Sequence, residues 1–444
     1  MKNYVYIETL GCSKNQVDSE VMMGLFKEKE YYMTDNPEQA QIIVVNTCGF
    51  IESAKEESVN TILDMAIYKN EHVCEYLIVT GCLAERYAND LVNEIPEVDA
   101  FVGTTAFDEI MKIVDALGDK GERISQTGNI DKEFAEGLPR ELSTPSHFAF
   151  LKIAEGCDNL CTYCIIPKLR GKYRSRTIES IVDEANALAK QGVKELIVIA
   201  QDTTRYGIDI YGEYKLYELL EKLNEVEGIE WIRLQYMYPD IVDEKLIKTI
   251  ASCEKVVDYF DIPVQHASNR ILKRMKRNTS KEDIEALIKS IRTHIPKASI
   301  RTTMIVGFPG ETEEDFEELL TFVENAKFDR LGAFTYSKEE NTAAYNLDGQ
   351  VDEDIMKERH AKLMMLQQDV SEVIQQNKIG QVMRVVIEET TDDPKVYVGR
   401  TSLDAPEVDG VCYVHTEGEL LEVGQFVDVK IDDAMEFDVM GVKL

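Results

Sequence analysis

The stretch GCDNLCTYC, residues Gly156 to Cys164, places Cys157, Cys161 and Cys164 in a C-x3-C-x2-C run directly after a strand-like segment, Phe148 to Ile153. Three thiolates this close together can each bind one iron of a 4Fe-4S cluster, because soft sulfur ligands suit iron-sulfur chemistry. The fourth iron then lacks a protein ligand and is free to bind a small molecule. The run therefore predicts a catalytic iron-sulfur site at the end of a strand.

Zinc is the alternative metal for such a run, since zinc loops pair two CxxC-like halves. No second half lies within about 20 residues of Cys157 to Cys164, the separation that such halves usually show. The surrounding sequence therefore favours an iron-sulfur cluster.

Beyond this run, the middle of the chain alternates strand-like and helical segments. Apolar runs of strand length that precede stretches with helical spacing are typical of parallel βα units. Six such units predict an open partial barrel in a domain that spans residues 148–376. The expected strands are Phe148 to Ile153, Glu195 to Ala200, Trp231 to Gln235, Asp258 to Val264, Ile300 to Val306 and Leu331 to Thr335.

The segments on either side predict two further domains and a linker, so the chain is expected to be a multidomain α/β protein. Residues 1–118 show the βα alternation of a doubly wound domain. Residues 119–147 are polar and rich in turn residues without periodicity, which predicts a linker. A long helix over 351–378 then leads into residues 377–444, where short strands and turns predict a small all-β barrel. The remaining expected strands are Tyr4 to Glu8, Ile42 to Asn46, Tyr76 to Thr80, Gln381 to Glu388, Lys395 to Arg400, Gly410 to His415 and Gln425 to Ile431.

A second group of three cysteines lies in the first domain. Cys12, Cys48 and Cys82 each come just past the carboxyl end of an expected parallel strand. Their spacings, 48 minus 12 or 36 and 82 minus 48 or 34, match successive βα units. Because the carboxyl ends of parallel strands share one edge, the three thiols should converge and hold a second cluster.

Ordinary burial is the alternative for this second group, since free cysteines are common in cores as small hydrophobes. Three equivalent positions favour the cluster instead. The other three cysteines, Cys74, Cys253 and Cys412, have no such placement, and we expect them not to be ligands.

The C-x3-C-x2-C run with Tyr163 before its last cysteine resembles the defining motif of the radical S-adenosylmethionine (SAM) superfamily. The resemblance implies that the free iron binds SAM, that Tyr163 lies beside its adenine and that reduction yields a 5'-deoxyadenosyl radical. The strand-end run IVGFPGET, with Gly307 and Pro309, resembles a cofactor-contact segment of the same superfamily, although a plain strand-to-helix turn would also fit it.

The order of the three domains resembles the methylthiotransferase family over nearly the whole chain, with a carboxyl-terminal TRAM domain. Members of this family insert sulfur and a methyl group at a C–H bond, with two 4Fe-4S clusters and SAM as cofactors. Within the family, LGCSKNQVDSE (10–20) and DAPEVDG (404–410) resemble the branch that modifies an aspartate of the twelfth protein of the small ribosomal subunit. The resemblance also implies an external electron donor and a sulfur source, and no proton-accepting catalytic residue is identifiable from these motifs.

The composition predicts a strongly acidic cytoplasmic protein. The 444 residues include 82 Asp and Glu against 49 Lys and Arg, a formal charge of −33. No secretory pattern and no run long enough to span a bilayer is present, so we expect no membrane contact. Such a charge repels phosphate backbones and favours a basic partner.

Charge also separates the alternatives for function. A tRNA adenosine methylthiotransferase would share both clusters, but residues 377–444 hold 6 basic and 15 acidic residues, a balance of 6 minus 15 or −9. We therefore expect no direct tRNA binding and, as partner, a basic ribosomal protein or the small ribosomal subunit, facing acidic residues such as Glu407 and Asp409. A non-catalytic electron-transfer protein is the alternative of another class, and it leaves the open iron position unexplained. Two basic runs, 170–176 and 270–277, could contact rRNA, an anionic cofactor or only solvent.

Overall fold

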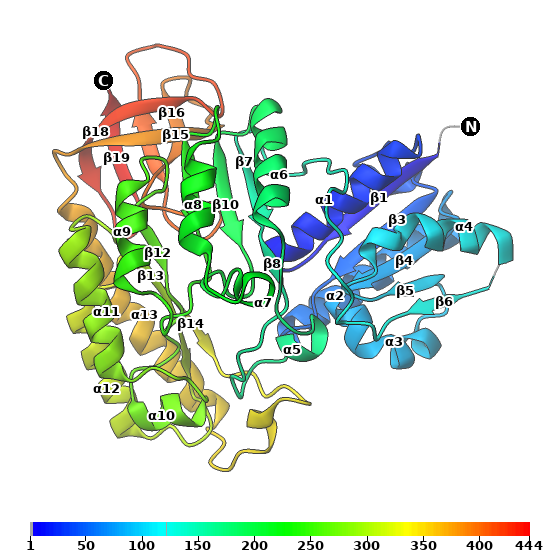
Figure 1. Ribbon diagram of the computed structural model, residues 1–444, viewed down its shortest axis with the longest axis horizontal. Helices are drawn as coiled ribbons and strands as arrows, with labels where there is room; N and C mark the ends of the chain where they lie inside the picture. The colour runs from blue at the N-terminus through cyan, green and yellow to red at the C-terminus, as the bar shows by residue number, and fades with distance from the viewer. Residues whose placement is uncertain (1–2, 121) are drawn as a thin grey trace.

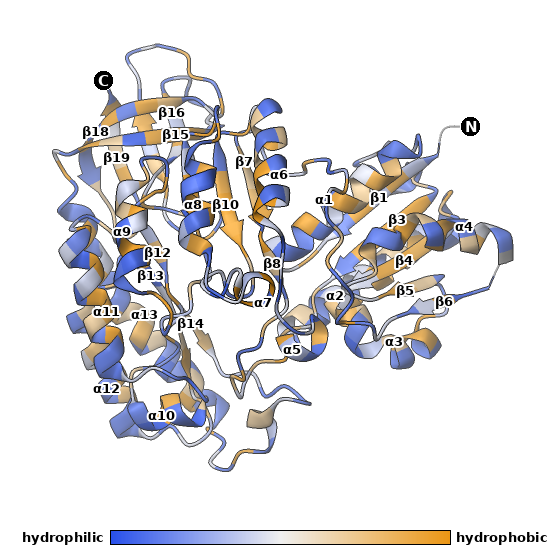
Figure 2. Cartoon of the chain, viewed as in Figure 1, coloured by the Kyte–Doolittle hydropathy of each residue, from blue (hydrophilic) through white to orange (hydrophobic). Residues whose placement is uncertain are grey.

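The computed structural model describes residues 3–120 and 122–444. The chain forms an amino-terminal α/β unit, a curved parallel sheet covered by helices, and a small β-barrel at the carboxyl end (Figure 1). Apolar residues fill the strands and the inner faces of the helices, whereas the outer helix faces are polar (Figure 2). Within the described ranges, every helix is too short or too polar to cross a membrane.

The amino-terminal sheet has six parallel strands in the order β2-β1-β3-β4-β5-β6. The three strands expected from the sequence are β1, β3 and β4, and the other three have only two or three residues each, too few to produce a periodic pattern. The strands are β1 (Tyr4–Thr9), β2 (Tyr32–Met33), β3 (Ile42–Thr47), β4 (Tyr76–Gly81), β5 (Ala100–Val102) and β6 (Ile124–Gln126). The helices are α1 (Ser13–Glu28), α2 (Glu52–Glu71), α3 (Cys82–Glu94) and α4 (Ile110–Lys120).

The segment expected as a linker, residues 119–147, is built into both neighbouring units. Its strand β6 pairs in parallel with β5 and so extends the amino-terminal sheet. Arg140, whose side chain is 6% exposed, pairs with Glu20 of α1 and with Glu184 of α6 (Ile178–Lys190). The sequence did not indicate these contacts with both units, because the segment consists of polar turn residues and a single ion pair leaves no periodic signal.

The curved sheet contains the six expected strands in chain order. β7, β10 and β11 form one three-stranded parallel sheet and β12, β13 and β14 form another, joined by an isolated bridge between Ile232 and Val256. The strands thus form an open arc, as the sequence predicts. The strands are β7 (Phe148–Lys152), β10 (Glu195–Ile199), β11 (Trp231–Leu234), β12 (Tyr259–Asp261), β13 (Ser299–Val306) and β14 (Arg330–Thr335), and the covering helices are α6, α8 (Leu216–Asn224), α9 (Glu244–Ser252), α11 (Lys281–His294) and α12 (Glu313–Ala326).

The two faces of this arc bury different partners. Leu151 and Leu196 belong to the large core under the helices. On the opposite face, Phe150 and Ile197 pack with Val17 of α1. Helix α1 therefore covers the inner face of the first strands, and it runs beside β7 in Figure 1.

The carboxyl-terminal unit follows the long helix α13 (Glu353–Gln376) and is a closed five-stranded barrel in the order β15-β16-β17-β19-β18. The sequence pattern predicted four of its strands. The fifth, β19, closes the barrel by pairing with β17 in parallel and with β18 in antiparallel. The strands are β15 (Val382–Thr390), β16 (Val396–Thr401), β17 (Cys412–His415), β18 (Phe426–Ala434) and β19 (Val439–Lys443).

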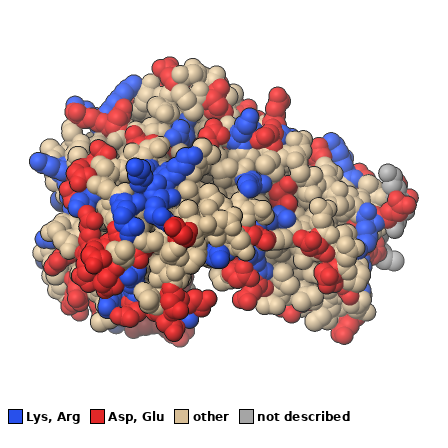
Figure 3. All heavy atoms as spheres, turned by 90° about the horizontal axis from the view of Figure 1, so that it is seen from below, with Lys and Arg blue, Asp and Glu red and all other residues tan. Residues whose placement is uncertain are grey.

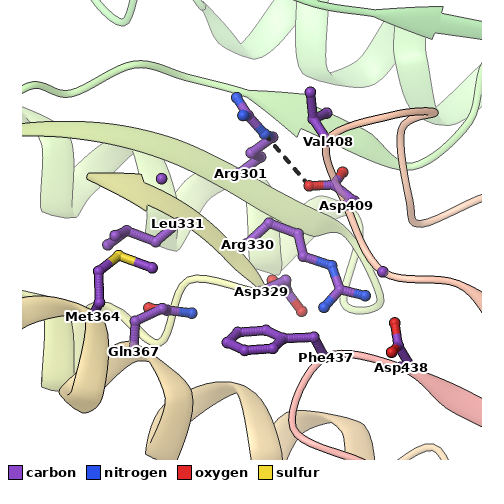
Figure 4. A pocket seen from close by; sticks show the side chains of 12 residues that line it. Arg301, Asp329, Arg330, Leu331, Met364, Gln367, Val408, Asp409, Phe437 and Asp438 are labelled. Atoms are coloured by element: carbon purple, nitrogen blue, oxygen red, sulfur yellow. Dashed lines mark ion pairs between the residues drawn. The ribbon is translucent and has the colours of Figure 1, made fainter. Parts of the chain in front are cut away.

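The loop DAPEVDG fastens this barrel to the curved sheet around a small cavity (Figure 4). Asp404 pairs with Arg330 of β14, and the Tyr259 hydroxyl donates to Asp409 at 2.6 Å. Asp409 also pairs with Arg301 at 3.5 Å, and its side chain is only 2% exposed. The expectation that Asp409 faces a substrate is therefore wrong, because its charge is used inside the molecule, whereas Glu407 in the same loop is exposed.

Candidate active site

The C-x3-C-x2-C loop begins where the short strand β8 (Ala154–Glu155) ends. Gly156 has a φ of 80°, and a Cβ atom there would lie 2.1 Å from the carbonyl oxygen of Lys172, so the chain path requires glycine. The N–H group of Cys157 donates to the carbonyl of Gly171 at 3.1 Å, which holds the start of the loop. The loop ends at the short helix α5 (Ile166–Leu169), which begins two residues after Cys164.

A buried arginine lies against this loop. The guanidinium group of Arg277 donates to the Sγ atom of Cys161 at 3.7 Å and stacks 3.8 Å from the centre of the Tyr238 ring. The Tyr238 hydroxyl lies 3.8 Å from the same sulfur. A cation beside a thiol favours the thiolate form that an iron ligand needs. This end of the second basic run thus serves the site. Figure 3 shows Lys and Arg side chains gathered on one face of the molecule.

Cys12, Cys48 and Cys82 lie at the carboxyl ends of the neighbouring strands β1, β3 and β4. Gly11 has a φ of 88°, and a Cβ atom there would lie 2.7 Å from the Cβ atom of Cys48, so two of the three loops touch. Burial raises the pKa of Cys82 to about 12, Arg170 opposes this rise, and the thiols of Cys12 and Cys48 add to it. The parallel topology therefore brings the loops that carry the three thiols to one edge of the sheet.

The donor set of each thiol group, three cysteine sulfurs, suits an iron-sulfur cluster. Within residues 3–120 and 122–444, no three His, Cys, Asp or Glu side chains are close enough to enclose one metal ion. A cluster presents a separate iron to each thiolate, so its ligands need not meet at one point. All nine cysteines are free, and burial raises the pKa of Cys157 to about 12, so metal binding would release protons.

Asn15 connects the loops of the amino-terminal thiols. Its side-chain amide donates to the carbonyl oxygen of Leu10 at 2.8 Å and to that of Thr47 at 3.0 Å. These carbonyls lie just before the Cys12 and Cys48 positions. The side-chain oxygen of Asn15 accepts a hydrogen bond from Arg170, which belongs to the segment after α5.

Arg170 joins the two thiol groups through a buried ion network. Its side chain is 2% exposed and pairs with Asp18 of α1 at 3.0 Å and with Glu155 at 2.9 Å. Lys152 of β7 pairs with the same two carboxylates. The short helix α5 and the residue before it also pack near Cys82, through Leu169 and Ile165. The first basic run therefore begins inside the protein and not on a nucleic-acid surface.

Arg170→Met is expected to lower the free energy of unfolding by about 3–5 kcal/mol, because it leaves two buried carboxylates with a single cation. Urea denaturation of the metal-free protein measures the change. The matched control is Arg174→Met, since Arg174 is more exposed and its pair with Asp131 spans 3.8 Å. The control should change stability by less than about 1 kcal/mol. Equal stability of Arg170→Met and the unmodified protein would contradict the network's role.

A cavity of about 890 Å³ lies between the two α/β units. Gln265 and Thr303 line it from the curved sheet and Tyr163 from the cysteine loop. Phe50 lines it from the loop after Cys48, and Ser53 from the start of α2. Both thiol groups therefore have neighbours in one cavity, which is large enough for a nucleoside-sized cofactor.

The predicted cofactor segment lies beside this cavity. The N–H group of Gly307 donates to Glu311 at 2.9 Å, and the carbonyl of Pro309 accepts from Arg274 at 3.0 Å. The described residues that line the cavity include Ile305 of the same strand but not Gly307 or Pro309. Contact of these two residues with SAM therefore stays a prediction.

Two non-glycine residues at strand ends have a left-handed backbone. Tyr236 follows β11 with a φ of 61°, and Gln265 follows β12 with a φ of 77°. Such conformations cost about 1–3 kcal/mol each and collect at functional sites. The sequence analysis did not identify either residue, and no sequence signal marks them. It included Asn15 only within the 10–20 motif, and Arg170 and Arg277 only as the ends of the two basic runs.

Models of three known families match successive parts of the chain. The Uncharacterized protein family UPF0004 model matches residues 4–103, the Radical SAM superfamily model matches 151–323, and the TRAM domain model matches 379–443. A protein of Clostridioides difficile called ribosomal protein uS12 methylthiotransferase RimO is 54% identical over 437 residues, with 98% of each chain covered. The chain belongs to the RimO family. RimO of Clostridium perfringens strain 13 (99% of this chain, 98% of the relative) and of Desulforamulus reducens (98% of each) are both 50% identical.

Solved structures of more distant proteins share the fold of this RimO family member. The radical SAM methyltransferase TsrM of Kitasatospora setae, solved with tryptophan and a SAM analog, superposes with a TM-score of 0.55 at 13% identity. The match covers 75% of this chain and 73% of TsrM. The cobalamin-dependent SAM radical enzyme OxsB gives 0.53 at 14% identity, over 82% of this chain and 56% of OxsB.

Proposed function

We propose that this protein methylthiolates ribosomal protein uS12 at the β-carbon of an aspartate, with SAM and two 4Fe-4S clusters as cofactors. The observation that carries the proposal is the pair of three-cysteine groups at strand ends, with residues next to both groups lining one cavity, in a chain that matches RimO over 98% of its length. When bound, the cofactors would supply hydrogen abstraction, sulfur and a methyl group. An external electron donor and a sulfur source complete the reaction, which we place in the cytoplasm, where ribosomes are found.

The chain's own residues hold and separate these cofactors. Cys157, Cys161 and Cys164 would hold the cluster that binds SAM, and Tyr163 would border the adenosyl group in the cavity. Cys12, Cys48 and Cys82 would hold the second cluster. Substrate would enter between the loop after Cys48 and the end of β14, whose residues face each other across the cavity.

Charge on the carboxyl-terminal barrel supports a protein substrate over tRNA. Arg400 is 1% exposed and pairs with Glu195, and Lys378 is 9% exposed. Arg384 pairs with Glu230, and Lys443 pairs with Glu419. Most of the six basic residues are thus neutralised or buried, so little positive charge remains to bind a phosphate backbone. Asp404 and Asp409 are internal too, but exposed acidic residues such as Glu407 and Glu417 remain.

The reconstituted enzyme is expected to modify uS12, free or in the small ribosomal subunit, and to leave tRNA unmodified. Mass spectrometry of both substrates after reaction measures this. Capture of uS12 should weaken between 0.1 M and 1 M salt, because the screening length falls from about 10 Å to about 3 Å. Modified tRNA together with unmodified uS12 would establish the tRNA alternative.

The double change Glu407→Lys with Glu417→Lys should weaken uS12 capture severalfold, because it reverses exposed charge on the barrel. Formation of 5'-deoxyadenosine should not change. Glu28→Lys, at the exposed carboxyl end of α1, adds positive charge far from the barrel and serves as the control. Equal capture by both variants would show that the barrel does not bind uS12.

A further inference from the structure

Lys14 is a buried cation without an anionic partner in the described part of the chain. The residue is only 5% exposed. Its one described interaction is with the ring of Tyr236, whose centre lies 2.9 Å from the Nζ atom. An aromatic face offsets only part of the penalty of burying an ammonium group. The site therefore favours the arrival of an anion.

Lys14 has neighbours that belong to each of the two thiol groups. Cys12, the N-cap of α1, comes two residues before it. Tyr236 lies just past the carboxyl end of β11, and Tyr238, two residues further on, contacts the Sγ atom of Cys161 at 3.8 Å. Ligands of parallel sheets bind at this edge. Lys14 thus lies, with Tyr236, between segments that belong to the two thiol groups.

The first turn of α1 adds to the attraction for an anion. Its free N–H groups carry partial positive charge, and the N-cap residue Cys12 makes no side-chain cap. The hydroxyl of Ser13 is buried and has no hydrogen-bond partner among the described residues. Asp18, one turn later on the helix, does not neutralise Lys14, because it pairs with Lys152 and Arg170.

Other cations near the boundary between the two α/β units have partners or face solvent. Lys55 and Arg86 both pair with Glu339. Lys338 is exposed and lies over the ring of Tyr345. These contacts leave Lys14 as the best placed group to receive a carboxylate.

We propose that Lys14 binds the side-chain carboxylate of the substrate aspartate and so positions its β-carbon between the two thiol groups. The inference rests on the proposed function, in which an aspartate is modified. The β-carbon is bonded directly to the carboxylate carbon, so holding the carboxylate fixes the reacting carbon. In a chain with a net charge of −33, a carboxylate also needs a local cation to enter. Lys14 would therefore select aspartate over asparagine, which is nearly the same size but uncharged.

The test compares two forms of uS12. One carries the aspartate that the enzyme would modify, and in the other this residue is changed to Asn. Wild-type protein should bind and modify the Asp form in preference. In Lys14→Met, affinity for the Asp form should fall about 10- to 100-fold to the level of the Asn form, the usual range for losing a charged hydrogen bond. Iron content, 5'-deoxyadenosine formation and the denaturation midpoint should stay close to wild type. Lys14→Arg should restore part of the Asp preference.

Lys29→Met, at the exposed carboxyl end of the same helix, is the matched control and should keep the full Asp preference. An unchanged Asp preference in Lys14→Met would overturn the inference. So would loss of iron or of 5'-deoxyadenosine in that variant, because Lys14 would then serve the cofactors. If Lys14→Met does not fold, Lys14→Arg decides. Binding of the Asp form of uS12 no tighter than binding of the Asn form would then overturn the inference. Failure of the wild type to modify either form would instead refute the proposed function.

Discussion

Replacing Cys12, Cys48 and Cys82 together by Ala should abolish methylthio transfer to uS12 while 5'-deoxyadenosine still forms on reduction. The physical reason is the separation of the two thiol groups: these three cysteines belong to the amino-terminal sheet, and the SAM-motif loop follows β8 of the curved sheet. The second cluster loses all its ligands, whereas the loop at Cys157 keeps its own contacts with Gly171. Product analysis by mass spectrometry and chromatography of the nucleoside measures both outcomes.

The matched control for this variant is Cys74→Ala. Cys74 is buried in the same domain but lies just before the amino end of β4, at the opposite end of that strand from Cys82. Its loss should reduce stability slightly and leave both reactions intact. If the triple variant folds and keeps its first cluster but no longer cleaves SAM, the division of roles between the two groups is wrong.

Replacing Cys157, Cys161 and Cys164 by Ala should remove SAM cleavage entirely and halve the iron content. Anaerobically reconstituted protein should hold about eight irons in two clusters of four, and this variant about four. Iron analysis and the absorption of the reconstituted protein measure the change. The remaining iron should disappear when Cys12, Cys48 and Cys82 are also replaced.

Cys253 and Cys412, which belong to neither thiol group, serve as controls for this second variant. Cys253 and Cys412 are buried in the cores of their own domains, so their replacement by Ala should leave the iron content near eight. A loss of all iron from the Cys157, Cys161 and Cys164 variant would mean that the clusters do not form independently.

Sequence patterns predicted the repeated βα units well because each has a long apolar strand and a helix with its own periodicity. They missed the short strands β2, β5, β6, β8 and β19, whose few residues gave too little periodic signal. They also misplaced Asp409. An acidic residue in a turn looks solvent-exposed in a sequence, and only packing against Tyr259 and Arg301 revealed it as internal.

The sequence by itself determined the two sets of thiols and their positions at strand ends, because local spacing and strand periodicity suffice for both. Tertiary structure alone decided what surrounds them. Arg170 and Asn15 connect the two sites through contacts between segments about 155 residues apart, and Lys14 meets Tyr236 across the domain boundary. Such long-range partners follow from how the two units pack, and packing is set by buried shape and charge that no local pattern contains.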